Sequence, residues 1–88
     1  MDHGDLRDTP ICEPQVTDYD RVHLLAYLRL LDAAAAHADW REAAAVILGL
    51  DVEADPDRAH RIHDAHLRRA RWMAQTGYRD LLASAGRK

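Results

Sequence analysis

The sequence contains no phenylalanine and a single cysteine, Cys12. One cysteine cannot form an intrachain disulfide, which excludes a small secreted scaffold held together by disulfides. The chain also lacks a long apolar run: its apolar stretches fall far short of the roughly 20 residues that a membrane-spanning helix needs. The N-terminus shows no basic segment followed by an apolar one, as a signal peptide would. We therefore expect a cytoplasmic protein.

The chain is also short, with 88 residues and a mass of 10.0 kDa. This length supports one hydrophobic core and excludes a multidomain enzyme with separate cofactor and substrate domains. Alanine occupies 16 positions. Such abundance of a small, strongly helix-forming residue predicts closely packed helices.

The net charge of −3 conceals an uneven distribution. Residues 1–20 carry six acidic groups against Arg7 alone, a net charge of −5, whereas residues 21–88 carry eleven basic and nine acidic groups, a net charge of +2. DNA-binding domains tend to be strongly basic. A pI near 6.0 weakens the interpretation of this chain as a DNA-binding domain without excluding it.

Two regions differ in their residue pattern. Residues 1–17 combine Gly4, Pro10 and Pro14 with scattered acids and no periodicity, which predicts a disordered acidic arm. Within it, Ile11 and Val16 could dock on the domain. Residues 18–85 show helical periodicity without strand-like alternation, so we expect an all-α bundle of about four helices.

Capping residues place the helices. The first should begin at Thr17 or Asp18 and run to about His37, while the second should open with a capping box of Asp39 and Glu42. The remaining predicted boundaries are Gly49 as the end of the second helix, Asp55 as the cap of a third helix from Pro56 to about Thr76, Gly77 as its end, and a last helix over residues 78–84.

A capped helix, a glycine, a turn and a basic helix follow one another in the order of a helix-turn-helix motif. Ala45, Gly49 and Leu50 have the spacing of that motif, but the link from Gly49 to Pro56 is long, so the sequence predicts a variant with an extended turn. The residues expected in the core are Leu24, Leu28, Leu31, Ile47, Leu48, Leu50, Ile62, Met73, Leu81 and Leu82.

The third predicted helix carries the candidate binding surface. At about 100° per residue, one side gathers arginines and a tryptophan. The candidate partner-binding residues are Arg58, Arg61, Arg68, Arg69 and Trp72, with Trp40 or Tyr27 at the rim. Arginine binds phosphates, guanine edges and protein carboxylates. The alternative is a merely solvated charged face.

Catalytic and metal-binding patterns are weak. His60, His63 and His66 spread over about 120° of one helix, so they are poorly placed to bind one ion together. Cys12 lies in the arm without a capping helix or strand to lower its pKa, and no glycine-rich phosphate loop is present. We therefore expect a non-enzyme without metal, cofactor or small-molecule substrate.

Four segments resemble the bacterial domain-of-unknown-function family 2285, found in regulators of integrative and conjugative elements. The most specific is the sequence Gly-Tyr-Arg-Asp-Leu-Leu at residues 77–82; the others are residues 28–33, 40–44 and 68–71. The resemblance covers about residues 21–83. It implies a helix-turn-helix-like domain that binds DNA in some members. In short stand-alone members it acts as an antiactivator that binds activator proteins.

The acidic residues before the third predicted helix favour the antiactivator role over DNA binding. Asp51, Glu53, Asp55 and Asp57 stand where a DNA-reading helix would enter the groove, and carboxylates repel phosphates. The resulting hypothesis is an antiactivator of conjugative transfer, with weak or absent DNA binding. Its partners would be a LuxR-type quorum-sensing regulator and an activator with related domains. The alternatives are a small helix-turn-helix DNA-binding regulator and a homodimer through the alanine-rich first helix.

Overall fold

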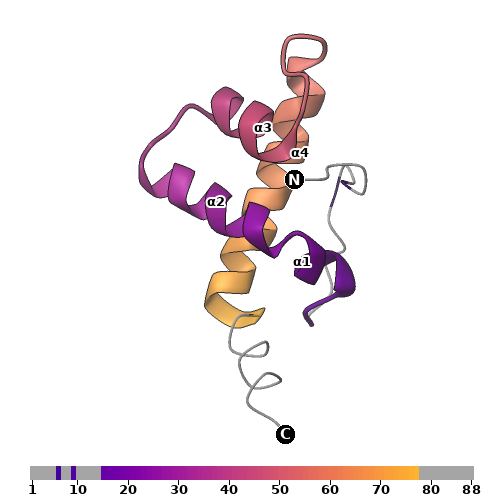
Figure 1. Cartoon of the computed structure of the whole chain (residues 1–88), viewed down its shortest axis with the longest axis vertical. Helices are drawn as coiled ribbons and strands as arrows, with labels where there is room; N and C mark the ends of the chain where they lie inside the picture. The colour runs from indigo at the N-terminus through magenta and orange to yellow at the C-terminus, as the bar shows by residue number, and fades with distance from the viewer. Residues whose placement is uncertain (1–5, 7–8, 10–14, 78–88) are drawn as a thin grey trace, which may run out of the picture.

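The computed structural model describes residues 6, 9 and 15–77. The helical elements in order are α1 (Asp18–Val22), α2 (Leu24–Ala35), α3 (Trp40–Leu48), α4 (Pro56–Trp72) and the π-helical turn η1 (Met73–Gly77). These residues include no strand (Figure 1). The predicted all-α class and small helical bundle are therefore confirmed.

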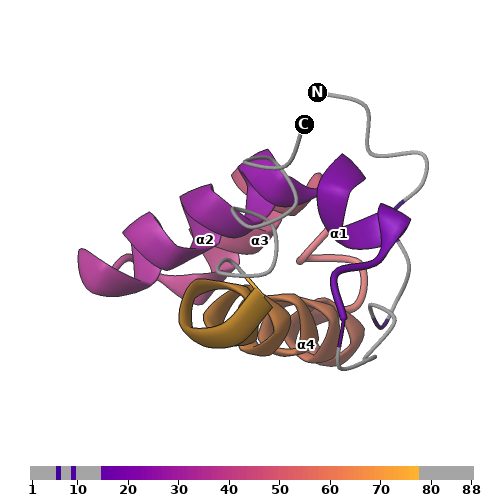
Figure 2. The ribbon, with the colours of Figure 1, turned by 90° about the horizontal axis from the view of Figure 1, so that it is seen from below.

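Helix α4 is the longest element and organises the others. Both α2 and α3 pack on it and on each other, while α1 contacts α2. Seen nearly along α4, the helices α2 and α3 lie together on one side of it (Figure 2). The opposite side of α4 is therefore left uncovered by the other described helices.

The first predicted helix is in fact two helices. At His23 the backbone leaves the helical region (φ −101°, ψ 15°), which separates α1 from α2. Thr17 caps α1: its hydroxyl accepts from the Asp20 amide, and the Asp20 carboxylate accepts from the Thr17 amide, so the two form a reciprocal capping box. Helix α2 then ends at Ala35, two residues earlier than predicted, and His37 takes a positive φ of 57°.

The predicted caps of the later helices are largely confirmed. The Asp39 carboxylate accepts from the Arg41 amide, although the reciprocal bond expected from Glu42 is not part of that cap. Gly49 ends α3 with a left-handed φ of 67°, which costs glycine little because it has no Cβ. Asp55 caps α4, and Pro56 occupies its first turn.

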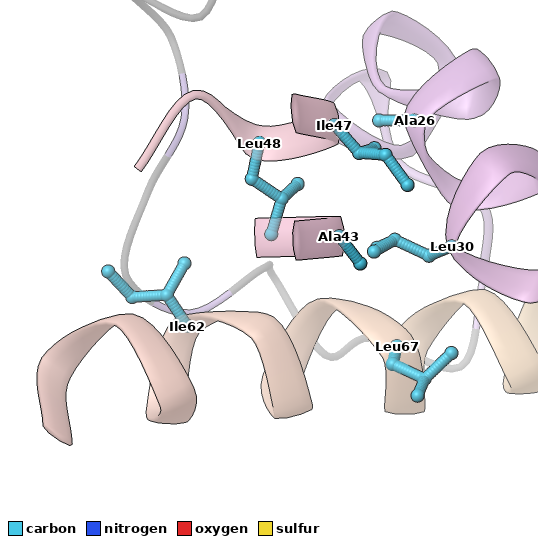
Figure 3. Close-up of a cluster of buried hydrophobic side chains, with 7 residues drawn as sticks. All are labelled: Ala26, Leu30, Ala43, Ile47, Leu48, Ile62 and Leu67. Carbon is cyan, nitrogen blue, oxygen red and sulfur yellow. The ribbon is translucent and has the colours of Figure 1, made fainter. Parts of the chain in front are cut away.

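The core forms where α2, α3 and α4 meet (Figure 3). One cluster contains Ala26, Leu30, Ala43, Ile47, Leu48, Ile62 and Leu67. Of the predicted core residues, Ile47, Leu48, Ile62 and Met73 are buried, and Leu24, Leu31 and Leu50 are half-buried. Leu28 was predicted wrongly: it is 47% exposed, because Leu30 and Tyr27 occupy the inner face of α2.

Parts of the predicted arm lie against this core. Leu6 packs on the main cluster, and Val16 packs on a second cluster of Tyr27, Ala70 and Met73, which confirms the docking predicted for Val16. Ile11, the predicted helix over residues 78–84 and the predicted core residues Leu81 and Leu82 fall outside the described residues.

Candidate nucleic-acid interface

The uncovered side of α4 carries arginines. Arg58, Arg61 and Arg68 are exposed, with the half-buried Ala65 between them. The opposite face is buried and comprises Ala59, Ile62, His63, His66, Leu67, Arg69 and Ala70. At 1.5 Å rise per residue, Arg58 and Arg68 lie roughly 15 Å apart along the helix. We call Arg58, Arg61 and Arg68 the arginine face.

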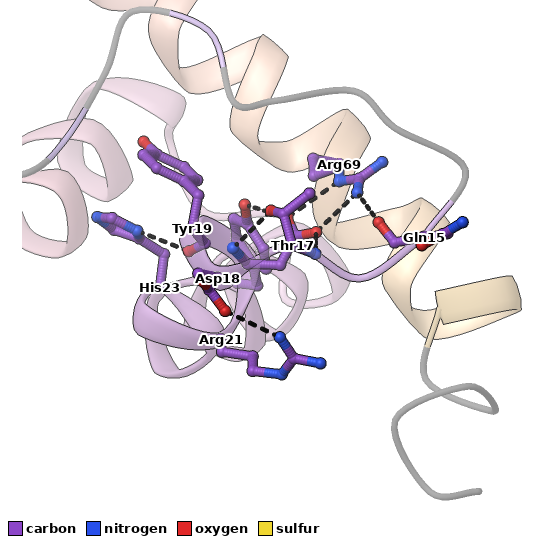
Figure 4. Close-up of polar contacts among 9 residues, drawn as sticks. Gln15, Thr17, Asp18, Tyr19, Arg21, His23 and Arg69 are labelled. Atoms are coloured by element: carbon purple, nitrogen blue, oxygen red, sulfur yellow. Dashed lines mark hydrogen bonds and ion pairs between the residues drawn. The ribbon is translucent and has the colours of Figure 1, made fainter. Parts of the chain in front are cut away.

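Arg69 does not belong to that face, which corrects the sequence-based placement. Its side chain is only 4% exposed, and its guanidinium binds the buried carboxylate of Asp20 in α1. Nε donates to Oδ1 at 3.0 Å and Nη2 to Oδ2 at 2.7 Å, while Nη2 also donates to the Gln15 carbonyl at 2.9 Å (Figure 4). The residue therefore anchors α1 to α4.

The Asp20 carboxylate is fully satisfied within this network. Besides Arg69, it accepts from the Tyr27 hydroxyl at 2.9 Å and from the Thr17 amide at 2.9 Å. Burial by itself would raise the pKa of Asp20, but these hydrogen bonds and the Arg69 charge outweigh it and hold the pKa below its ordinary value. Burial, followed by the neighbouring Asp20 carboxylate, raises the pKa of Tyr27 far above its ordinary value.

Sequence reasoning missed Asp20 as a structural partner of Arg69. The spacing of Thr17 and Asp20 is a capping-box signal that could have been found. The pairing with Arg69, 49 positions away, has no local signal. Tyr27, considered for the rim of the binding surface, is only 1% exposed and belongs to this buried network instead.

The helical pattern predicted an exposed Trp72, but the structure shows a half-buried one. The Arg69 guanidinium carbon lies 3.8 Å from the centroid of a Trp72 ring, a cation–π contact that covers the buried ion pair. Trp72 therefore borders the arginine face and also helps to shield Arg69 from water.

Trp40 is half-buried at the start of α3 and lies beside histidines of α4. Its ring centroid is 4.4 Å from that of His60 and 6.1 Å from that of His63, and the Arg41 guanidinium lies over it at 5.1 Å. Both histidines contact the Asp64 carboxylate, His63 at 3.0 Å and His60 at 3.3 Å. The Trp40 ring therefore packs beside the rings of His60 and His63 on α4.

The remaining histidine of the predicted trio has a packing role. His66 is fully buried; its Nδ1 lies 2.8 Å from the Ile62 carbonyl and its Nε2 lies 2.7 Å from the Tyr19 hydroxyl. Among the described residues, no group of three or more His, Cys, Asp or Glu side chains could hold a metal ion. In the same part of the chain, no helix is both long and apolar enough to cross a lipid bilayer.

The acidic turn before α4 is partly committed to local structure. The Asp51 carboxylate accepts from the Ala54 amide at 3.2 Å, and the Asp55 carboxylate caps α4 by accepting from the Arg58 amide at 3.1 Å. Both groups thereby stabilise the turn and the positive end of the helix dipole. The turn therefore holds the start of α4, and its acidic residues Asp51, Glu53, Asp55 and Asp57 are exposed directly before Arg58.

A protein-family model matches the chain over residues 3–83. The matching family is the RovC DNA-binding domain, described as "T6SS, Transcription factor, DNA binding domain". No curated protein matches the chain. No solved structure matches it either.

This match corrects the earlier family assignment. The resemblance to family 2285 was wrong, because the family model that matches is a different one, and nothing in the comparisons links the chain to antiactivators, quorum sensing or conjugative transfer. The prediction of weak or absent DNA binding is also wrong at the level of the family, which is one of DNA-binding domains and not of enzymes. With more than nine-tenths of its residues matched, the chain belongs to the RovC DNA-binding domain family of transcription factor domains.

Proposed function

We propose that this chain binds duplex DNA through the arginine face of α4 and acts in transcription regulation. The observation that carries the proposal is the placement of Arg58, Arg61 and Arg68 on the one side of α4 that the other described helices leave uncovered. The family match supports the same function.

The order of the helices supports α4 as the element that enters DNA. Helix α3, the glycine-containing turn and α4 follow one another as the two helices of a helix-turn-helix do, with a turn over residues 49–55. In that motif the N-terminal part of the second helix contacts base edges in the major groove. Arg58 and Arg61 occupy this part of α4, so they would contact bases or nearby phosphates, and Arg68 would contact phosphates.

Charge provides the attraction. Residues 56–72 contain five arginines and two aspartates. Because Arg69 is paired with the buried Asp20, the other four arginines and the two aspartates give a net charge of +2 with neutral histidines. Each phosphate that an arginine neutralises releases condensed counterions, which makes affinity fall with salt. Three such contacts predict a loss of roughly 40-fold when salt rises fourfold, from a slope of about −0.9 per contact.

The test is fluorescence anisotropy of a labelled duplex, titrated with protein at two salt concentrations. We expect salt-sensitive binding that falls at least about tenfold in Arg61→Ala/Arg68→Ala, since a guanine or phosphate contact contributes about 1–3 kcal/mol. The control is Arg41→Ala, which removes one charge from an exposed position in α3 and is compared with Arg61→Ala alone. Equal losses in both variants would contradict the assignment to α4.

A further inference from the structure

Helix α2 is apolar on its outer side as well as its inner side. Its inner face buries Ala26, Tyr27 and Leu30, yet Leu25 is 53% and Leu28 47% exposed on the outside. Val22, at the end of α1, adds a side chain that is 67% exposed. We call Val22, Leu25 and Leu28 the outer patch. A helix that is apolar nearly all round is normally covered on both sides.

The outer patch continues into a groove. A hollow of about 280 Å³ runs between α2 and the end of α4. It is lined by Leu24, Tyr27, Leu28, Leu31, Ala70, Met73 and Ala74. Because Leu28 belongs to both the groove and the patch, the apolar surface is continuous from α2 to η1. Helices α3 and α4 pack on α2, yet the exposure of Val22, Leu25 and Leu28 shows that they do not cover the patch.

The charges around the outer patch point to its occupant. Asp18 and Arg21 lie at one end and Arg29 and Asp32 towards the other, so each end carries one charge of each sign. Asp18 and Arg21 already pair at 3.0 Å, whereas Arg29 and Asp32 have no ion-pair partner among the described residues. A rim without net charge disfavours DNA. When two identical patches meet about a two-fold axis, such a rim can offer each charge an opposite one.

We propose that the outer patch is the interface through which two copies of this chain form a reversible homodimer. The area is modest: three partly exposed side chains and the edge of the groove fall below the roughly 800 Å² per partner of a standard stable interface. The dimer is therefore weak and depends on protein concentration. Because the groove is bordered by Ala70 on the buried face of α4, dimerisation leaves both arginine faces uncovered and does not rest on the proposed DNA binding.

Sedimentation of the full chain without DNA tests the proposal. Over a series from micromolar to several hundred micromolar, we expect the average mass to rise from 10.0 kDa towards twice that value. Val22→Asp/Leu25→Asp should weaken association at least tenfold, because it places charges in the centre of the interface. The matched control is Val46→Asp on α3, which alters a valine of similar exposure (68%) outside the patch and should associate as the wild type does.

Circular dichroism shows whether each variant is folded, and Leu25→Ser provides a milder change if the double aspartate variant is not. A wild-type chain that stays monomeric throughout the series would overturn the proposal. So would association that is unchanged in folded patch variants. DNA titration separates the two proposals: patch variants that lose dimerisation and still bind DNA support both. A wild-type chain that dimerises but does not bind DNA would contradict only the assignment of the arginine face.

Discussion

Arg69 of α4 and Asp20 of α1 form a two-point ion pair across 49 positions of sequence, with N···O distances of 3.0 and 2.7 Å. Both side chains are buried, at 4% and 0% exposure. The pair joins the first helix and the segment before it to the helix that carries the arginine face. Together with the buried contact between the Tyr19 hydroxyl and His66 Nε2 at 2.7 Å, this pair holds α4 against the N-terminal part of the domain.

Removing one partner of this ion pair should destabilise the fold strongly. We expect Asp20→Ala to lower the free energy of unfolding by about 3–5 kcal/mol, because it leaves the Arg69 guanidinium buried without its counter-charge. The double variant Asp20→Ala/Arg69→Met should lose less than the sum of the two single changes. Urea denaturation measures all three, with Asp18→Ala as a control at an exposed ion pair that should change little. Strict additivity would show that the pair is not coupled.

The same carboxylate predicts a loss of stability in acid. The folded-state pKa of Asp20 is lowered, so the stabilisation from its ionised form is complete above an ordinary aspartate pKa of about 4 and is lost as the pH falls through the lower, folded value. We expect the free energy of unfolding to fall more steeply below about pH 4 in the wild type than in Asp20→Asn. Parallel slopes would mean that other carboxylates account for the acid sensitivity.

Two neighbouring leucines of α2 should differ sharply in their contribution to stability. Leu30 is 1% exposed and lies in the main core cluster, so Leu30→Ala should cost about 2–5 kcal/mol. Leu28→Ala should cost less than about 1 kcal/mol in the monomer, because its side chain is half in water already. Thermal unfolding at low protein concentration compares the two without a contribution from self-association. Similar losses would contradict the outward orientation of Leu28.

The local signals of the sequence were sufficient for most helix ends. Thr17, Asp39 and Asp55 are caps because a short side chain with an oxygen acceptor can satisfy a free amide within its own turn. Gly49 ends α3 for an equally local reason, its left-handed backbone. The all-α class and the order of α3, turn and α4 follow from these signals together with the apolar periodicity. These signals did not predict the break at His23, because the apolar pattern continues through it without interruption.

The candidate binding surface was predictable only in part. Helical geometry alone groups Arg58, Arg61 and Arg68, and the structure leaves all three exposed. The same geometry also assigned Arg69 to the surface, because a helical wheel places a residue by angle and carries no information about what packs against the helix. Only the approach of α1 supplied Asp20, and with it the reason for an arginine to be buried.

The sequence by itself determined where the helices begin and end and that one of them is rich in arginine, because caps, glycine and periodicity act within a few residues. The tertiary structure alone decided which of those arginines reach water, that Trp72 covers the ion pair of Arg69, and that Leu28 faces outward. Those outcomes depend on contacts between residues far apart in the chain, whose free energy exists only once α1, α2 and α4 have come together.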